Sequence, residues 1–145
     1  MMIKNKKYLF HLLLIIFFVG CQHRVQIKSS QESLKEKLST PVYFSFGKWA
    51  LSPQEEKKLF EKISLLKANP AAVVILEGHT DSIGTEENNL ELGDRRAGYV
   101  RWKLSLEGVN PQNLIVTSVG ESQSTKSSLD ESVRSVDRRV DFKVK

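Results

Sequence analysis

An acidic and a basic side chain stand where they could bind a charged ligand together. Asp81 closes the run EGHTD at residues 77–81, and Arg96 is the second of two adjacent arginines. A guanidinium can hold a carboxylate through two parallel hydrogen bonds, while an Asp carboxylate accepts hydrogen bonds from an ammonium group. The pair therefore predicts a receptor for a ligand that carries an ammonium and a carboxylate close together.

Helical spacing favours Arg96 over its neighbour as the cation of this pair. Arg95 lies four residues after Glu91, so the two can form an exposed ion pair worth a few tenths of a kcal/mol. Arg96 instead shares its helix face with three residues that belong to the packed stripe: Asn89, Leu92 and Val100. We therefore expect Arg96 to point along the edge of this stripe toward the preceding loop.

Structural readings of the same residues stay open. Asp81 could order its own turn or pair with a nearby cation, and Arg96 could be an ordinary surface charge. If both belong to a surface site, changing either to Ala should leave thermal stability nearly unchanged, because polar surface changes seldom cost much folding energy. An equal loss of folding in both variants would indicate a structural ion pair.

His79 raises the questions of catalysis and of metal binding. It lies beside Asp81, as a general base beside its orienting acid would, but no Ser or Cys nucleophile accompanies them in a recognisable motif. His79 also has no partner at metal-ligand spacing along the chain, since His11 and His23 lie far before it. The sequence thus predicts no catalytic residue, no metal site and no cofactor.

The elements that must position these residues follow from the hydrophobic pattern. Val42, Phe44 and Phe46 alternate with polar residues, which predicts a strand. Residues 72–76 form a short apolar run typical of a central strand, with the turn 78–81 directly after it. Further strands are expected at 114–119 and 140–144, separated by a polar loop at 120–135.

Two helices are expected between these strands. Ser52 and Pro53 are the N-cap and first residue of a helix that Asn69-Pro70 ends, and Glu55 completes a capping box. A second helix should begin near Asn88 or Asn89 and run to about Glu107, with Gly108 as its stop. The order β-α-β-α-β-β predicts an α+β fold, an α/β sandwich with both helices on one face of a mixed sheet.

The N-terminal residues predict export and lipid attachment. Lys4, Lys6 and Lys7 precede an apolar stretch at 12–19 that is too short to span a bilayer, so residues 1–20 are interpreted as a signal peptide. Gly20-Cys21 resembles the lipobox at which a diacylglycerol is attached, with Phe18 where Leu is usual; the alternative is a chance cysteine. Residues 21–40 are expected to be a lipid-anchored tether, with a helical turn or two at 32–38, and residues 41–145 the folded domain.

The composition excludes some partners. The formal charge is +5, but 3 of the 22 basic residues lie in the signal segment, which leaves 19 against 17 acidic ones. This balance gives no nucleic-acid footprint, which would combine clustered Lys and Arg with aromatic residues. Cys21 is the only cysteine, so the chain cannot form an internal disulfide.

The run EGHTDSIG at 77–84, followed by Asn89 and by LGDRRA at 92–97, resembles the OmpA-like peptidoglycan-binding domain over Val42 to Val144. Within that family the chain is most similar to the peptidoglycan-associated lipoproteins of the Tol-Pal system. The resemblance implies that Asp81 and Arg96 bind diaminopimelate of the peptidoglycan stem peptide. It also implies a set of pocket neighbours: Gly84, Asn89, Leu92, Phe46 and Gly47.

The chain departs from the family pattern at several positions. Ser45 and Gly47 stand where Asp is common, and Asp137 replaces the Asn of an Asn-Arg-Arg run. Ser124 stands where Pro is common after Gly-Glu. We expect these changes to affect the strength of binding more than its mode.

The resemblance implies a binding protein and not an enzyme. Its expected partners are peptidoglycan, the outer membrane through the N-terminal lipid, and periplasmic Tol proteins; Gln22 after the cysteine favours the outer membrane over the inner one. Two alternatives remain. The domain could serve another envelope complex, in secretion or motility, or it could be a periplasmic hydrolase, which would release soluble wall fragments.

Overall fold

The computed structural model describes residues 32–125 and 130–145. The expected signal peptide, Cys21 and tether residues 22–31 lie outside the described residues. The described helices include none that is long and apolar enough to cross a membrane.

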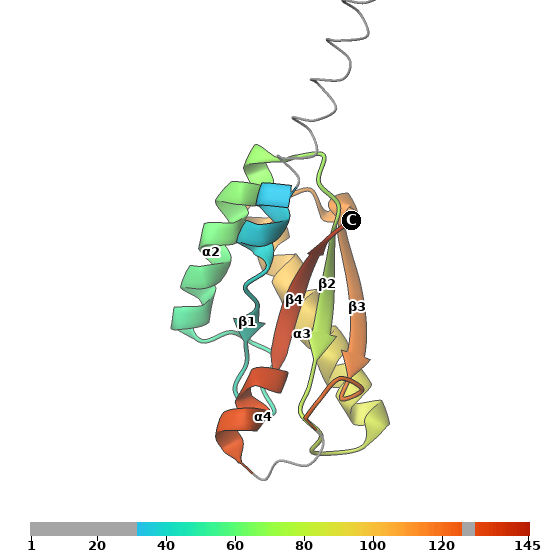
Figure 1. The fold of residues 1–145 in the computed structure, drawn as a ribbon. Coiled ribbons are helices and arrows are strands. Elements are labelled where there is room, and N and C mark those ends of the chain that lie inside the picture. The colour runs from blue at the N-terminus through green and yellow to red at the C-terminus, as the bar shows by residue number, and fades with distance from the viewer. Residues whose placement is uncertain (1–31, 126–129) are drawn as a thin grey trace, which may run out of the picture. The chain divides into compact units, whose positions relative to one another are not determined.

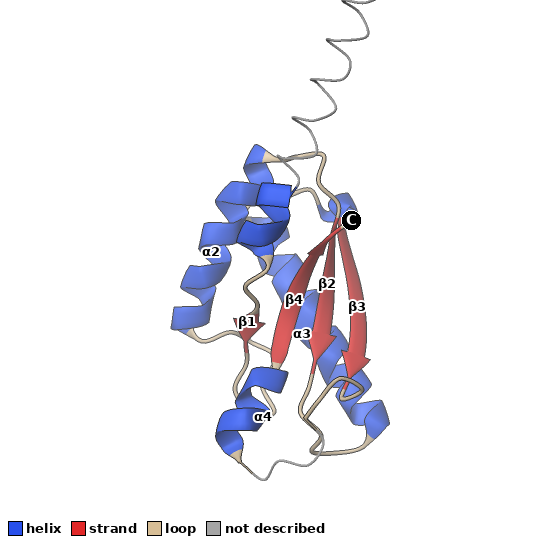
Figure 2. Ribbon diagram, viewed as in Figure 1, coloured by secondary structure: helices blue, strands red, loops and turns tan. Residues whose placement is uncertain are grey.

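Four strands form one mixed sheet in the order β1-β4-β2-β3 (Figures 1 and 2). The strands are β1 (Val42–Tyr43), β2 (Val74–His79), β3 (Leu114–Gly120) and β4 (Arg139–Val144). β2 runs parallel to β3 and antiparallel to β4, and β4 runs antiparallel to β1. The carboxyl end of β2 therefore lies beside the first residues of β4, which places segments far apart in the sequence next to one another.

Two long helices, α2 (Pro53–Ala68) and α3 (Glu86–Leu106), begin at well-formed caps. Ser52 accepts a hydrogen bond from the backbone N–H of Glu55, and Thr85 accepts one from that of Asn88. α3 packs along β2 and β3. The ammonium of Lys62 on α2 lies 4.8 Å from the ring centre of Phe142 on β4. The core fills the space between these helices and one face of the sheet.

The core face of the sheet follows from strand alternation. Val74 and Leu76 on β2 and Val140 and Phe142 on β4 are buried, and Leu76 is the register partner of Phe142. The other face carries the residues that alternate with them: Ile75, Glu77, Asp141 and Lys143. The predicted α+β fold, with two helices on one mixed sheet, is confirmed.

Several predicted boundaries are wrong. β2 continues through His79, so the turn begins only at Thr80. The glycine and the polar residues fit in the strand because Gly78 faces α3, while its two polar neighbours face the opposite side of the sheet. β1 ends at Tyr43, and Phe46 is 55% exposed. α3 begins at Glu86, where Thr85 supplies the cap.

The segment expected to be a polar loop contains a further helix, α4 (Glu131–Asp137). Asp130 caps it by accepting from the backbone N–H of Ser132. The helix ends next to Arg138, immediately before β4. Glu131 at its start accepts a hydrogen bond from the side chain of Arg138.

The folded region begins before the expected boundary at residue 41. Residues 32–38 are helical, and Leu38 is fully buried with its carbonyl accepting a hydrogen bond from Lys62. Residues 35–145 form one compact unit, and all buried hydrophobic side chains of the described residues lie between 34 and 142. A fragment of residues 32–145 therefore carries its own core and is expected to fold without the residues before it.

The contact of α3 with β2 depends on two glycines. A Cβ on Gly78 would lie 1.9 Å from the carbonyl oxygen of Gly93, so it would meet backbone and not the end of a flexible side chain. We predict that Gly78→Ala destabilises the fragment by about 1–3 kcal/mol in urea denaturation. Gly98→Ala is the control, because a Cβ at this position of α3 would have nothing within 4 Å. It should stabilise the fragment by about 0.5–1 kcal/mol. Equal effects would show that the close approach is unimportant.

Candidate functional site

Asp81 forms a buried ion pair with Arg138. The carboxylate Oδ2 lies 3.0 Å from Nη1 of the guanidinium, and the two residues are 3% and 4% exposed. Asp81 follows the carboxyl end of β2, and Arg138 directly precedes β4. The antiparallel pairing of these two strands, which puts Gly78 opposite Val140, brings the two side chains together.

Arg138 is held by three different segments of the chain. Its Nε donates to the carbonyl of Phe44 at 3.1 Å, and its Nη2 donates to the carboxylate of Glu131 on α4. Burial acts to lower the pKa of Arg138, but the hydrogen bonds with Glu131 and Asp81 prevail and raise it. The guanidinium is thus a fixed positive charge, and α4 helps to set its position.

Arg96 is completely buried and is bound by backbone carbonyls. Its Nε donates to Lys48 at 2.9 Å, and its Nη1 donates to His79 at 2.7 Å. The guanidinium carbon lies 5.2 Å from the ring centre of Phe44. The second terminal nitrogen, Nη2, is also buried and finds no acceptor among the described residues. One hydrogen-bonding position of a buried cation is therefore left for another group.

The charges of Asp81, Arg96 and Arg138 form one charged cluster. Burial lowers the pKa of Arg96 to about 10; the nearby Asp81 opposes this effect, and Arg138 adds to it. Arg96 remains protonated at neutral pH. Glu131, which pairs with Arg138, brings the count to two cations and two anions, so a zwitterion can join these side chains without leaving a charge in excess.

Asp81 and Arg96 are thus brought into one cluster, but Asp81 pairs with Arg138 and not with Arg96. Arg138 occupies the carboxylate, so a ligand ammonium must share or replace that contact. Sequence reasoning missed Arg138 because it noted the Asp137-Arg138-Arg139 run without the order of the strands. A prediction that β4 pairs with β2 would have put Arg138 next to Asp81.

The burial of these side chains also corrects the expected effect of mutation. Asp81 and Arg96 are 3% and 0% exposed, so neither is the surface polar residue that the expectation of unchanged stability requires. Removing one member of a buried ion pair leaves the other charge without compensation.

Gly84 and Asn89 lie together at the start of α3. Gly84 has φ +117°, a conformation that favours glycine, and a Cβ there would approach the Asn89 side chain at 3.5 Å. Asn89 is buried and donates to the carboxylate of Glu121. These contacts order the loop between β2 and α3; their part in ligand binding stays a prediction.

The remaining predicted neighbours lie near Arg96. Phe46 and Gly47 are in the exposed turn that is closed by a hydrogen bond from Lys48 N–H to the carbonyl of Ser45, and the carbonyl of Lys48 accepts from Arg96. Leu92 is half-buried on α3, one turn before Arg96. Whether these residues contact a ligand stays a prediction.

A cleft of about 370 Å³ borders the charged cluster. It is lined by residues of β1, its following segment, α2 and α4: Tyr43, Phe44, Ser45, Ser52, Glu55, Ser135 and Val136, together with Arg138. Because Arg138 belongs to both and Phe44 contacts both Arg96 and Arg138, a ligand in this cleft can contact the cluster. The cleft also presents the carboxylate of Glu55.

A larger groove of about 590 Å³ lies over α3. Its lining is mainly aromatic, with Trp49, Tyr99 and Trp102 around Gly98, and Arg95 is its charged residue. Arg95 pairs with Glu91 at 2.6 Å on the exposed surface, as its spacing predicted. Its lining contains no acidic residue, so the groove lacks the anion that recognition of an ammonium requires.

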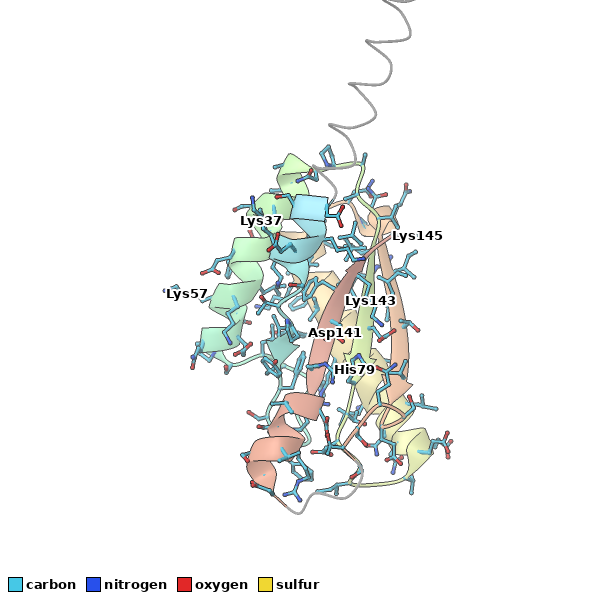
Figure 3. All side chains as sticks on the ribbon, in the orientation of Figure 1. Lys37, Lys57, His79, Asp141, Lys143 and Lys145 are labelled. Atoms are coloured by element: carbon cyan, nitrogen blue, oxygen red, sulfur yellow. The ribbon has the colours of Figure 1, made fainter. Side chains whose placement is uncertain are left out.

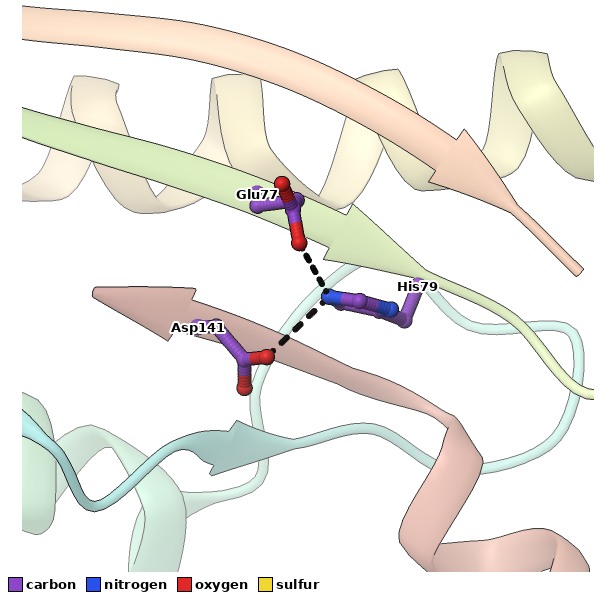
Figure 4. Close-up of side chains that lie close together, drawn as sticks. All are labelled: Glu77, His79 and Asp141. Carbon is purple, nitrogen blue, oxygen red and sulfur yellow. Dashed lines mark ion pairs between the residues drawn. The ribbon is translucent and has the colours of Figure 1, made fainter. Parts of the chain in front are cut away.

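His79 has two side chains near it in space that could bind a metal ion with it, although spacing along the chain predicted no such partner. Glu77, His79 and Asp141 present their ligand atoms within 4.8 Å of one another (Figure 4). Spacing along the chain could not reveal this group, because Asp141 comes from β4 and is the register partner of Glu77.

The model of the OmpA family matches residues 43–138. The chain belongs to the OmpA family. It is 36% identical over 111 residues to a peptidoglycan-associated lipoprotein of Pasteurella multocida, covering 77% of this chain and 73% of the relative.

Solved structures agree with this assignment. The crystal structure of the peptidoglycan-associated lipoprotein from Burkholderia pseudomallei matches with a TM-score of 0.68 and 33% identity, covering 72% of this chain and 89% of that one. The C-terminal domain of Helicobacter pylori MotB matches with a TM-score of 0.67 over 73% of this chain and 84% of that one. At 20% identity, it shows the fold alone.

The Asp81–Arg138 pair yields a stability prediction. Asp81→Ala should lower the free energy of unfolding of the fragment by about 3–5 kcal/mol, since it leaves a buried guanidinium unpaired. Asp81→Asn keeps the side-chain shape and should lower it less. Glu91→Ala, which breaks the exposed pair with Arg95, is the control and should cost about 0–1 kcal/mol. Urea denaturation measures all three; similar small losses for Asp81→Ala and Glu91→Ala would contradict a buried pair.

Proposed function

We propose that this chain is a lipid-anchored protein that binds peptidoglycan noncovalently and links the outer membrane to the cell wall. The observation that carries the proposal is the buried Arg96, whose Nη2 lacks an acceptor among the described residues, beside the Asp81–Arg138 pair. The domain supplies binding, and we assign it no catalytic residue.

The proposed ligand is the diaminopimelate of the stem peptide. This residue carries an ammonium and a carboxylate on one tetrahedral carbon at the end of its side chain. In this proposal Arg96 and Arg138 receive the carboxylate, and Asp81 accepts hydrogen bonds from the ammonium. Exchange of internal contacts for ligand contacts would keep every charge compensated, which favours a zwitterion over a simple anion.

The relatives support peptidoglycan as the partner. Several proteins at 36–38% identity are named peptidoglycan-associated lipoproteins, and they come from different bacteria. The chain shares with them most of its folded length. We accordingly propose the same partner here and a role with periplasmic Tol proteins.

Attachment to the outer membrane rests on the N-terminal sequence. The signal-like residues 1–20, Cys21 and Gln22 favour lipidation and transfer to the outer membrane. Each buried methylene of an attached lipid contributes about 0.8 kcal/mol, so two or more chains make a durable anchor. The domain would then lie in the periplasm, within reach of the wall.

Two other functions are distinguished by simple experiments. A domain of another envelope complex would bind the wall but would not be recovered with Tol proteins after crosslinking in cells. A wall hydrolase would release soluble fragments from purified sacculi, whereas a binding domain only cosediments with them. Membership of the OmpA family favours binding over hydrolysis.

Calorimetry on the 32–145 fragment tests the proposed ligand. We expect a stem peptide containing diaminopimelate to bind, and the matching lysine peptide to bind at least about tenfold more weakly, since it leaves the buried guanidinium without a carboxylate. Arg96→Lys should reduce binding of the diaminopimelate peptide similarly, because an ammonium cannot reproduce the planar fork.

Arg95→Lys is the matched control for that variant. It changes the adjacent, exposed arginine and should leave binding unchanged. Thermal melting of each variant separates a loss of the site from a loss of the fold. Equal binding of the two peptides, or equal effects of the two substitutions in folded variants, would refute diaminopimelate recognition by Arg96.

A further inference from the structure

We infer that Glu77, His79 and Asp141 form a binding site for a divalent transition-metal ion, and Zn²⁺ is the ion with which we would test it. The three side chains point toward one another (Figure 4). They lie on the face of the sheet opposite α3, where Figure 3 labels His79 and Asp141. This inference is independent of the proposed peptidoglycan binding.

The spacing of the three ligand atoms suits a metal ion. Nε2 of His79 lies 3.1 Å from Oε1 of Glu77 and 3.1 Å from Oδ2 of Asp141. Zinc binds imidazole nitrogen and carboxylate oxygen at about 2.0–2.2 Å, which places tetrahedral ligand atoms roughly 3.3 Å apart. An ion can thus enter between the three atoms after only small side-chain movements.

The sheet holds these ligands before any ion arrives. Glu77 and His79 are two residues apart on β2 and share one face, and Asp141 is the register partner of Glu77 on β4. The backbone hydrogen bonds of the two strands fix these three positions. Little conformational entropy would therefore be lost on binding.

His79 supplies the second observation that points to a ligand. The residue is 1% exposed, yet neither of its ring nitrogens has a hydrogen-bond partner among the described residues. Nε2 is close to both carboxylates without the alignment of a hydrogen bond to either. Buried polar atoms are rarely left in this state, and a metal ion at the centre of the group would satisfy Nε2.

Two basic residues compete with a metal ion for the carboxylates. Lys143 pairs with Glu77, and Arg139 donates to both oxygens of Asp141 at 3.0 and 3.2 Å. Lys143 has a half-exposed side chain and can move into solvent, while Arg139 can keep one oxygen of Asp141 and leave the other. An ion-pair network without metal is the competing explanation. In that case, removal of the Lys143 side chain would not tighten zinc binding.

The donor set selects the class of metal. One imidazole and two carboxylates suit Zn²⁺ and similar transition-metal ions, whereas Mg²⁺ and Ca²⁺ prefer sites made of oxygen alone. Three protein ligands leave a fourth position for water.

The proposed site adjoins the charged cluster through one residue. The side chain of His79 faces the three-ligand group, while its backbone carbonyl accepts a hydrogen bond from Arg96. A bound ion would crosslink β2 to β4 at the ends that carry Asp81 and Arg138. Binding should therefore stabilise the folded domain.

Calorimetric titration of the untagged 32–145 fragment with ZnCl₂ tests the inference. We expect saturable binding of one ion, a higher Tm in the presence of zinc, and no comparable heat with MgCl₂. Glu77→Gln and Asp141→Asn should each weaken zinc binding by at least about tenfold. Asp94→Asn, on the exposed side of α3, is the control and should bind as the unchanged fragment does.

Lys143→Ala distinguishes a metal site from an ion-pair network. Removal of the competing ammonium should tighten zinc binding if Glu77 is a ligand. His79→Gln should abolish binding, and the carboxylate variants keep the test decisive if that variant does not fold. The inference is overturned if no saturable binding occurs up to about 1 mM zinc, if Lys143→Ala leaves the affinity unchanged, or if the folded carboxylate variants bind zinc as well as Asp94→Asn does.

Discussion

The buried guanidinium of Arg96 is the constraint on which the site depends. A charge without solvent must be compensated by hydrogen bonds, and here the carbonyls of Lys48 and His79 provide them. These carbonyls belong to the turn after β1 and to the end of β2, while the arginine belongs to α3. The same contacts that make burial of the charge tolerable therefore fix three segments relative to one another.

Arg138, the second buried arginine, makes the surroundings of Arg96 a candidate binding site. Arg138 neutralises Asp81 and is itself tied to Phe44 and Glu131, so the anion is already compensated before any ligand arrives. A ligand with one charge would leave part of the cluster unbalanced. A zwitterion can exchange contacts at both ends, which explains how such a site can be selective while remaining stable when empty.

The sequence predicted the fold because local and global signals agree over most of the chain. Ser52 and Pro53 predict the start of a helix whatever that helix packs against. The alternation of apolar and polar residues around Phe142 predicts a strand without knowledge of the neighbouring strands. Pairing between strands is different. The roles of Arg138 and Asp141 depend on β4 lying beside β2, which spacing along the chain does not encode. Residues 120–135 were mistaken for a loop because α4 has few apolar residues.

The end of β2 shows how strict alternation lets one strand serve two chemistries. Gly78 faces α3 and permits the close approach of Gly93, whereas Glu77 and His79 face the opposite side and meet Asp141. The polar character of these residues suggested a turn, yet their pairing partners on β4 keep them in the sheet. Since the backbone of His79 also holds Arg96, any change that shifts the register of β2 must disturb both faces at once.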